Sequence, residues 1–488
     1  MRILYIDVDC CRPDHLSCNG YSRLTSPNID KIASEGVSFT NCHAANSPCL
    51  PSRAALFSGR FGFNNGIVSH SGEGEHMRPN SISHHQDAKK PFWVHHLWKH
   101  GYRTVAFSSF ADRHNAWWWS AGWAEHYTPT QKKGSETAEE IGNPALRWLD
   151  QNAGSDNWFL DVHFWDAHSV YRVPKEYVTK FHKEPAEWLP DEETLEQHRQ
   201  MYGPRTARDI LVPGRKNYVP PNHTDEVRTP EDVKLLIDGY DGSIAHVDYY
   251  VGKILEVLKA KDVLEDTAVI ISADHGDCFG EMGLYMDHCI ASPSVHNIPM
   301  IIRWPGMQGR GHNNALIYNL DLCPTTCRLL NLPVPSEWDG ESFDAAVRGE
   351  TFEGREYLVY DHGIHTLSRG VRTKDWALVA LYHSGLYSYD ERFYVYDMVN
   401  DPHQLHNLYY ERRDIFNLLS GYLFEWRMDQ VQKGGAPDPL ENMVATGPYA
   451  YITPAMMEER LRETGREEMI PRFSERLARI RIDQCRKN

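Results

Sequence analysis

Residues 47–54 read Ser47-Pro48-Cys49-Leu50-Pro51-Ser52-Arg53-Ala54, and they tell more about this chain than any other stretch. Pro51 suits the first turn of a helix, because the N–H that proline lacks would have no partner there. The spacing of the apolar residues that follow predicts a helix that ends at Gly59. Cys49 would then lie at the N-terminal end of this helix, where free N–H groups and the helix dipole attract an anion. Arg53, one turn later, adds a guanidinium that we expect to point the same way.

Short strand-like runs alternate with helical patterns over most of the chain. The runs rich in β-branched or aromatic residues are Ile3–Val8, Val37–Asn41, Tyr102–Phe107, Trp158–Phe164, Ala268–Ser272 and Pro299–Arg303. The helical patterns cover Pro27–Glu35, Pro51–Ser58, Pro91–His100, Ala138–Asn152 and Glu231–Lys261. This alternation predicts an α/β fold, in which a large, mostly parallel sheet is sandwiched by helices. Ligands in such folds bind at the carboxyl ends of the strands, where Asp9, His168 and Asp274 are found.

The composition changes around Gly340–Gly349, which predicts a second unit. Residues 1–345 are expected to form a catalytic α/β domain, and residues 346–440 a smaller C-terminal subdomain with an antiparallel sheet and a helix. Residues 441–488 are predicted to form a helical tail that packs back or joins a partner chain in a homo-oligomer. The polar, proline-bearing residues 181–230 are expected to form a lid or specificity insertion, with a purely structural insertion as the alternative.

Bulk composition excludes several classes of function. The chain has 488 residues, of which 41% are apolar and 24% charged, as in globular proteins. Its net charge of −16 argues against nucleic acid or an anionic membrane as the main partner. No stretch approaches the ~20 apolar residues of a membrane span, and Arg2–Ile6 reads as a core strand rather than a signal peptide. The ten cysteines form no disulfide-like framework, so we expect a cytoplasmic protein.

The segment Cys49-Leu50-Pro51-Ser52-Arg53 resembles the C-x-P-S-R signature of the type I sulfatases, a family within the alkaline phosphatase superfamily. In that family a maturase oxidises the cysteine to formylglycine, whose hydrated aldehyde is the nucleophile. The resemblance therefore implies that Cys49 is converted to formylglycine and that Arg53 belongs to the catalytic group. It also implies a formylglycine-generating maturase as a partner of this chain.

Two further segments resemble the metal-binding motifs of the same family. In the first, residues 7–14, Asp9 matches the first aspartate of a D-D-L-R-P-D turn and Cys10 stands in place of the second. The other segment, residues 272–277, resembles S-D-H-G-E through Asp274 and His275. The resemblance implies one divalent cation bound by Asp9, Asp274, His275 and the modified Cys49. The family favours Ca²⁺, whereas the missing carboxylate and the added histidine shift the expectation towards Mn²⁺ or Mg²⁺.

The part of the site that would bind sulfate departs from the family pattern. Ser108-Ser109-Phe110-Ala111 stands where the family has a first sulfate-binding lysine, and Asp287 stands in place of a second. His168 aligns with a family histidine that contacts the sulfate or the leaving oxygen, with Asp166 expected to orient it and His163 expected to point into the sheet. The residues expected to supply positive charge instead are Arg53, His70, Arg113, His168 and His288, with His114 beside them as a further substrate-binding residue. Because histidines titrate near pH 6.5, activity is expected to vary steeply between about pH 6 and 8.

Residues 115–123 form the most aromatic stretch of the chain and include four tryptophans. Sugar rings stack on half-exposed indoles, whose N–H groups are then free to bind hydroxyls. Trp117 and Trp118 are therefore predicted to bind a carbohydrate, against the alternative that such residues pack in the core.

The leading hypothesis is a sulfatase that hydrolyses a sulfate ester, most readily that of a sulfated sugar or oligosaccharide. His168 or His288 would protonate the leaving oxygen. A phosphonate monoester or phosphodiester hydrolase of the same superfamily is the alternative that the single aspartate and His275 favour. A catalytically weak sulfoglycan-binding protein is the alternative from another class, suggested by the two missing lysines.

Overall fold

A computed structural model describes residues 1–78, 91–211, 223–434, 436–479 and 483–484. Within these residues, nine strands form the large sheet, in the order β11-β2-β10-β7-β1-β6-β4-β5, with β12 also paired to β2. In chain order these strands are β1 (Arg2–Val8), β2 (Val37–His43), β4 (Arg103–Phe107), β5 (Glu125–Tyr127), β6 (Trp158–Phe164), β7 (Thr267–Ser272), β10 (Asn297–Arg303), β11 (Gly311–Asn313) and β12 (Ile317–Tyr318). Only β10 runs antiparallel to its neighbours among these described strands, so the prediction of a mostly parallel sheet is confirmed.

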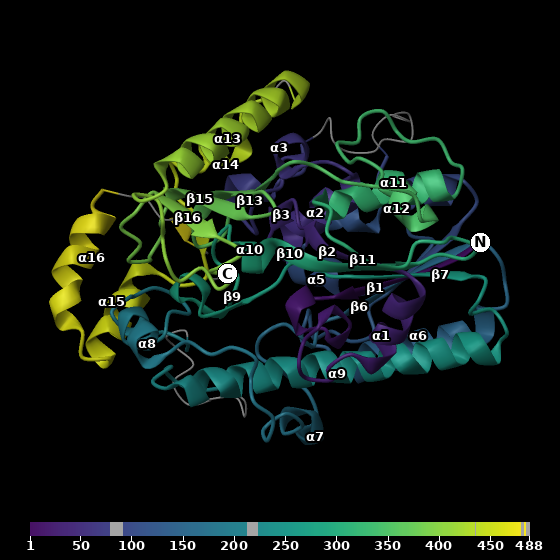
Figure 1. Ribbon diagram of the computed structural model, residues 1–488, viewed down its shortest axis with the longest axis horizontal. Coiled ribbons are helices and arrows are strands. Elements are labelled where there is room, and N and C mark those ends of the chain that lie inside the picture. The colour runs from purple at the N-terminus through teal and green to yellow at the C-terminus, as the bar shows by residue number, and fades with distance from the viewer. Residues whose placement is uncertain (79–90, 212–222, 435, 480–482, 485–488) are drawn as a thin grey trace.

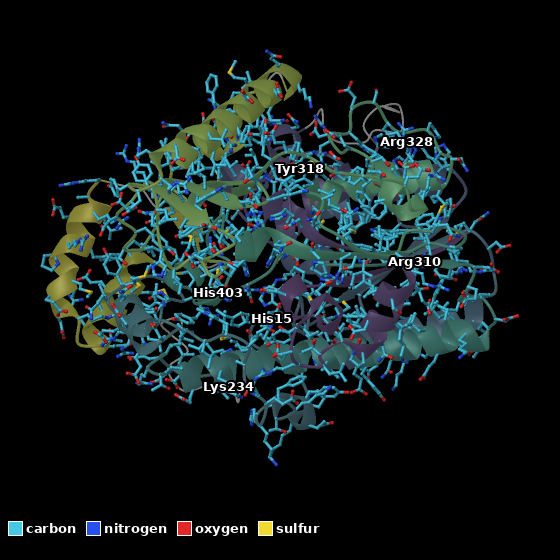
Figure 2. All side chains as sticks on the ribbon, in the orientation of Figure 1. His15, Lys234, Arg310, Tyr318, Arg328 and His403 are labelled. Atoms are coloured by element: carbon cyan, nitrogen blue, oxygen red, sulfur yellow. The ribbon has the colours of Figure 1, made fainter. Side chains whose placement is uncertain are left out.

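Helices cover both faces of this sheet (Figure 1). One face is covered by α1 (Pro27–Glu35), α6 (Ala138–Asn152) and the long α9 (Pro230–Ala260), and the other by α2 (Cys49–Ser58), α4 (Trp93–Lys99), α11 (Leu322–Leu329) and α12 (Asp344–Arg348). β6 and β7 are buried along their whole length, and β1 from its second residue, as expected for strands covered on both faces. The turn after β1 is tied to α9 through His15, whose Nδ1 lies 2.8 Å from Asp241 Oδ1 (Figure 2).

The second sheet is smaller and mostly antiparallel, in the order β16-β15-β14-β13-β3. Four of its strands come from the C-terminal part, as predicted, namely β13 (Leu358–His362), β14 (Leu367–Arg372), β15 (Trp376–His383) and β16 (Phe393–Asp397). The fifth, β3 (Asn46–Ser47), comes from the N-terminal part and pairs with β13 in parallel. α13 (Arg413–Gly434) packs on this sheet. The small sheet thus holds the segment that leads directly into α2 and Cys49.

The C-terminal helices pack back on the 181–230 excursion rather than extending away from the chain. The elements concerned are α8 (Glu192–Arg199), α15 (Pro454–Glu463) and α16 (Ile470–Leu477). Arg466 binds the backbone carbonyl of Met201 and the carboxylate of Asp209, and Phe473 packs on Tyr202. The predicted lid includes residues 212–222, and the predicted tail includes residues 480–482 and 485–488, which lie outside the described residues. The domain boundaries and the homo-oligomer stay predictions.

Among the helices that the structure describes, none combines the length and the apolar character needed to cross a lipid bilayer.

Candidate active site

Cys49 is the first residue of α2, which begins two residues earlier than the sequence predicts. The Ser52 amide closes the first turn on the Pro48 carbonyl at 2.9 Å, and the helix ends at Gly59, whose φ of 65° is readily adopted by glycine. All residues of α2 are buried, and Cys49 is only 1% exposed. Burial and the carboxylates of Asp9 and Asp274 raise the pKa of the Cys49 thiol well above its usual value. An unmodified Cys49 is therefore a neutral thiol, which is a poor nucleophile.

Arg53 points beneath Cys49, into a buried group of carboxylates. Its Nη1 lies 2.5 Å from Asp274 Oδ2 and 3.1 Å from Asp9 Oδ2, and its Nε donates to Asp7 Oδ2 at 3.0 Å. Its Nη2 lies 2.6 Å from His163 Nε2. Although burial alone raises the pKa of Asp9, Arg53 and the hydrogen bond to His163 hold it well below its usual range. The guanidinium thus keeps Asp9 ionised.

Strand register explains why these acids meet. β1 lies between β6 and β7, with Asp7 level with both His163 and Ser272. The residues that follow the two strands, Asp9 and Asp274, therefore emerge side by side. The main-chain N–H groups of Cys10 and His275 both donate to Asp274 Oδ1, at 3.0 and 2.9 Å.

The four predicted metal ligands come together. Asp9, Cys49, Asp274 and His275 each offer one ligand atom, and these atoms all lie within 4.8 Å of one another. His275 Nδ1 lies 3.0 Å from the Gly276 carbonyl, which leaves Nε2 facing Cys49 Sγ at 3.1 Å. Two carboxylates and an imidazole nitrogen suit a divalent cation, so the donor set fits the metal that the family implies.

His163 is a site residue that the sequence reasoning missed. It was expected to point into the sheet, but its Nε2 lies 3.3 Å from Asp9 Oδ2, and its Nδ1 lies 2.8 Å from Ser108 Oγ. Ser108 follows β4, in the segment that lacks the family lysine. The sequence does contain a signal for this role of His163. A histidine on a buried central strand, level with Asp7 in the neighbouring strand, needs polar partners.

The residues predicted to bind substrate gather on the other side of Cys49. Cys49, His70 and His114 offer ligand atoms within 4.8 Å of one another, and the rings of His70 and His114 are 4.7 Å apart. His70 Nδ1 lies 2.7 Å from the hydroxyl of Tyr451, a tail residue that the sequence reasoning also missed. No local sequence signal marks Tyr451, because its partner is 381 residues away.

His168 lies beside Arg113, with 3.3 Å between His168 Nε2 and Arg113 Nη2. The expectation that Asp166 orients His168 is wrong, because Asp166 Oδ1 pairs with His246 Nδ1 on α9 at 2.8 Å. Burial and the Arg113 charge lower the pKa of His168 to about 3.

His288 completes this side of the site. Its ring lies 4.2 Å from that of His275 and 6.1 Å from that of His168. Although burial alone lowers the pKa of His288, Asp277 and Asp287 raise it to about 9. His70 and His114 have pKa values well below the usual range, because partial loss of hydration and the nearby Arg113 charge both disfavour the protonated ring. The pKa values of His168 and His288 thus lie outside the range from pH 6 to 8, and those of His70 and His114 are lowered, so these four histidines no longer support the expectation of steep pH dependence there.

The two tryptophans predicted to bind a carbohydrate differ in exposure. Trp118 is 3% exposed and stacks on Phe92 with 5.9 Å between ring centroids, so it is a core residue and its predicted binding role is wrong. Trp117 is 61% exposed. Trp117 and Trp118 lie in the short 3₁₀ turn Trp117–Ser120, in which successive side chains point about 120° apart. One indole can therefore be buried while the next is exposed.

Comparison with known proteins gives the family. The Sulfatase family model matches residues 2–332, and the model for the C-terminal part of N-sulphoglucosamine sulphohydrolase matches residues 280–429. An N-acetylglucosamine-6-O-sulfatase of Bacteroides thetaiotaomicron is 23% identical, over 84% of this chain and 82% of the relative. An arylsulfatase of Clostridium perfringens is 24% identical, over 83% and 90%.

Solved structures share the fold. BT4656, in complex with its substrate D-glucosamine-2-N,6-O-disulfate, superposes with a TM-score of 0.69 at 18% identity, covering 90% of this chain and 99% of that one. The phosphonate monoester hydrolase of Agrobacterium radiobacter superposes with a TM-score of 0.68 at 19% identity, covering 88% and 96%. The match of the Sulfatase model to more than half of the residues shows that this chain belongs to the sulfatase family, the hydrolases of sulfuric esters.

Proposed function

We propose that this sulfatase hydrolyses a sulfate ester of a carbohydrate, with Cys49 as the residue that becomes the formylglycine nucleophile. The observation that carries the proposal is the convergence of Cys49, Asp9, Asp274 and His275, whose ligand atoms lie within 4.8 Å of one another at the start of α2. Asp9, Asp274 and His275 would hold the divalent cation together with position 49. When both are in place, the hydrated aldehyde supplies the attacking oxygen and the cation supplies charge that favours its ionisation.

Arg53 acts as a positioning residue in this proposal. It contacts Asp7, Asp9, Asp274 and His163, and it is 1% exposed. Its positive charge therefore pairs with the carboxylates beneath the nucleophile. With Arg53 in place, Asp9 stays ionised, and the carboxylates of Asp9 and Asp274 are held in a fixed direction. Preorganised charge of this kind costs no rearrangement during the reaction.

Sulfate would be bound on the side of Cys49 that carries Arg113, His70, His114, His168 and His288. Arg113 is the permanent cation of this group, and its side chain lies against His168 and the Trp165 ring. His288, with a pKa of about 9, is protonated at neutral pH and can donate a proton to the leaving oxygen. His168, with a pKa of about 3, is neutral and serves as a hydrogen-bonding group. The structure therefore favours His288 over His168 as the acid.

A carbohydrate is favoured as the alcohol part of the ester. Relatives in this family are named for sulfated amino sugars, including the N-acetylglucosamine-6-O-sulfatase and BT4656 with its disulfated glucosamine. The exposed Trp117 lies four residues after Arg113 and offers an indole face to a sugar ring.

The test is a screen of sulfated monosaccharides and oligosaccharides with enzyme co-expressed with a maturase. Mass spectrometry of the peptide that contains residue 49 measures conversion of Cys49, and the Cys49→Ala variant is the control. We expect sulfate release in proportion to conversion. Full conversion without release from any sulfated sugar would contradict the proposed substrate, and an unconverted thiol in the native host would favour a sulfoglycan-binding protein.

A phosphonate monoester or phosphodiester hydrolase is the second candidate. It is supported by the fold shared with the Agrobacterium radiobacter enzyme and by a ligand set with one aspartate after β1 and a histidine after β7. Turnover of a sulfate monoester and a phosphodiester by the same converted enzyme separates the two. A higher kcat/KM for the phosphodiester would replace the proposal.

A further inference from the structure

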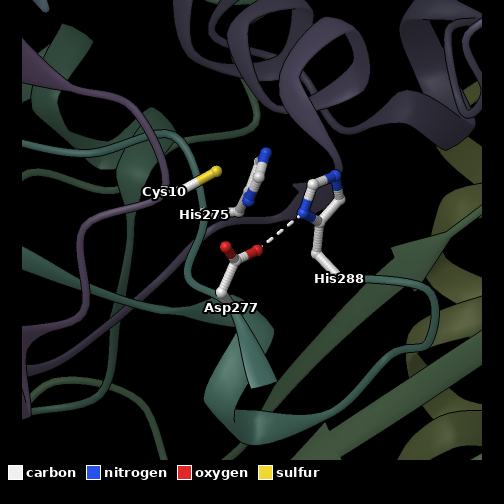
Figure 3. A group of neighbouring side chains, drawn as sticks. All are labelled: Cys10, His275, Asp277 and His288. Carbon is white, nitrogen blue, oxygen red and sulfur yellow. Dashed lines mark hydrogen bonds and ion pairs between the residues drawn. The ribbon is translucent and has the colours of Figure 1, made fainter. Parts of the chain in front are cut away.

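A second group of possible ligands lies beside the proposed metal site. Cys10, His275, Asp277 and His288 each offer one ligand atom, and these atoms all lie within 4.8 Å of one another (Figure 3). Of these four side chains, only His275 is also a proposed ligand of the first cation. Cys10 occupies the position after Asp9, and its thiol points towards His275 (Figure 3).

A short hairpin brings Asp277 and His288 together. β8 (Cys278–Phe279) and β9 (Tyr285–Asp287) form a hairpin in which Cys278 pairs with Asp287. Asp277 precedes this hairpin and His288 follows it, so the two side chains meet across its open end, with Asp277 Oδ1 2.8 Å from His288 Nδ1. Arg12 fixes the Asp277 backbone by donating to its carbonyl at 2.9 Å.

Asp277 carries a feature that points to a missing ligand. Its side chain is fully buried, and its Oδ2 has no hydrogen-bond partner among the residues that the structure describes. A buried carboxylate oxygen without a partner is costly, and native proteins satisfy nearly all such atoms. Arg53 contacts Asp7, Asp9 and Asp274, and none of its contacts in the described part of the chain includes Asp277.

We propose that Cys10, Asp277 and His288 bind a second cation, of the Zn²⁺ type, next to the first. A thiolate, an imidazole and a carboxylate are the ligands that Zn²⁺ takes, at about 2.0–2.3 Å, and ligand atoms within 4.8 Å of one another can surround one such ion. His275 belongs to both groups, but a single lone pair on Nε2 binds one ion. We assign His275 to the first cation, so the second has three protein ligands and an open position.

This second cation would supply positive charge that the two missing lysines supply in the family. This part of the inference rests on the proposed function. The family lysine position is occupied by Asp287, directly before His288, so the new ligand lies next to the place where a lysine would bind sulfate. An ion with an open position can take a sulfate oxygen there. The chain would then replace a fixed ammonium group with a bound metal.

The first experiment measures metal content without turnover. Purified enzyme is saturated with Ca²⁺ and Zn²⁺, freed of excess ions by gel filtration, and analysed by mass spectrometry of the elements. We expect one zinc per chain in the wild type and less than about a tenth of that in Cys10→Ser and in Asp277→Asn. The matched controls are Cys11→Ser, a neighbouring buried thiol that bonds the Arg12 carbonyl, and Asp339→Asn, whose carboxylate accepts from the Phe61 amide and the Asn64 side chain. Both controls should keep the zinc.

A second measurement identifies the sulfur ligand. Co²⁺ in place of zinc gives a thiolate-to-metal charge-transfer absorption, which we expect in the wild type and in Cys49→Ala and expect to be lost in Cys10→Ser. Circular dichroism shows whether each variant is folded, and Asp277→Asn answers the question if Cys10→Ser does not fold. Wild-type enzyme that takes up no zinc, or zinc that stays in both variants, overturns the inference. Zinc on His288 would displace the proton that the proposed function assigns to this residue, so sulfate release is measured separately, with converted enzyme that holds Ca²⁺ alone. The zinc content and this activity are independent readouts, so the two proposals fail separately.

Discussion

The candidate active site is built from two regions that differ in origin and in burial. The floor, consisting of Asp7, Asp9, Arg53, His163 and Asp274, comes from α2 and from the ends of three adjacent strands, and each of its residues is at most 3% exposed. The rim, consisting of His70, Arg113, His114, His168 and Tyr451, comes from loops, a short helix and the C-terminal tail. All rim residues are partly exposed, and Tyr451 is 51% exposed.

The difference shows which part of the site is free to change. In the floor, a cation meets three carboxylates, and any substitution leaves a buried charge without its partner. In the rim, pairs such as His70 and Tyr451 are hydrogen bonds at the surface, where water can replace a lost partner. Arg53 of the floor lies in the segment that matches the C-x-P-S-R signature letter for letter, whereas neither position of the family lysines, after β4 and at Asp287, carries a lysine. In the proposed function, the chemistry therefore depends on the floor, and substrate choice depends on the rim.

The largest effect is expected at the nucleophile, where floor and rim meet. Cys49→Ala removes the thiol group that must be oxidised to the aldehyde, so the hydrated aldehyde that supplies the attacking oxygen in the proposed function cannot form. Activity on a sulfated sugar should therefore fall by at least about 10⁴-fold. The measurement is initial sulfate release under saturating substrate. Cys327→Ala, a buried thiol on α11, should keep activity within about twofold. A Cys49→Ala enzyme with a tenth of wild-type activity would remove Cys49 from its role.

The next effect tests the floor by its stability. Arg53→Met leaves Asp7, Asp9 and Asp274 buried without their guanidinium, which should lower the free energy of unfolding by about 3–5 kcal/mol. Urea unfolding in the absence of divalent cations measures this, and added Ca²⁺ should restore part of the loss, since a bound cation offsets the same charges. Arg103→Gln breaks a half-exposed pair with Glu125 and should cost less than about 1 kcal/mol. Equal costs for the two variants would show that the floor is no more sensitive than the surface.

The pH dependence tests the charge of His288. Its pKa is raised from 6.5 to about 9, so its positive charge and the stability that this charge adds are fully present below about pH 6.5 and are lost as the pH rises through about 9. For enzyme loaded with Ca²⁺ alone, we expect kcat/KM to be flat from about pH 6 to 8 and to fall about tenfold per unit above pH 9. His288→Gln should lose this falling limb, and His96→Gln, on α4, should keep it. A bell centred on pH 7 would contradict the assignment.

The smallest effect concerns the rim. Tyr451→Phe removes the hydroxyl that lies 2.7 Å from His70 Nδ1, and a single hydrogen bond at a partly exposed position is worth about 1 kcal/mol. We expect KM for a sulfated sugar to rise about fivefold, with kcat and thermal stability nearly unchanged. Tyr410→Phe loses a comparable contact to Glu391 on the surface and should leave KM unchanged. A large fall in kcat for Tyr451→Phe would place Tyr451 in the floor's chemistry instead.

Local sequence predicts the helices and strands because the spacing of apolar residues and the residues that begin or end a helix are both set within a few positions. The predicted bounds of α1, α6 and β6 are those of the structure, and the helix of Cys49 ends at Gly59 as predicted. β3 could not be predicted, since a strand of two residues carries no pattern of its own and exists only through its pairing with β13.

The sequence by itself determined that Asp9 and Asp274 lie at the same edge of the sheet, because parallel strands place their carboxyl ends together. The resemblance to the sulfatase motifs added His275 and Cys49 to this pair. Tertiary structure alone decided where Arg53 points, which face of the tryptophan cluster is exposed, and that Tyr451 reaches His70 across 381 residues. It also moved the pKa values of His168 and His288 away from neutrality. Burial and charge pairing depend on contacts between distant segments, and no local pattern encodes them.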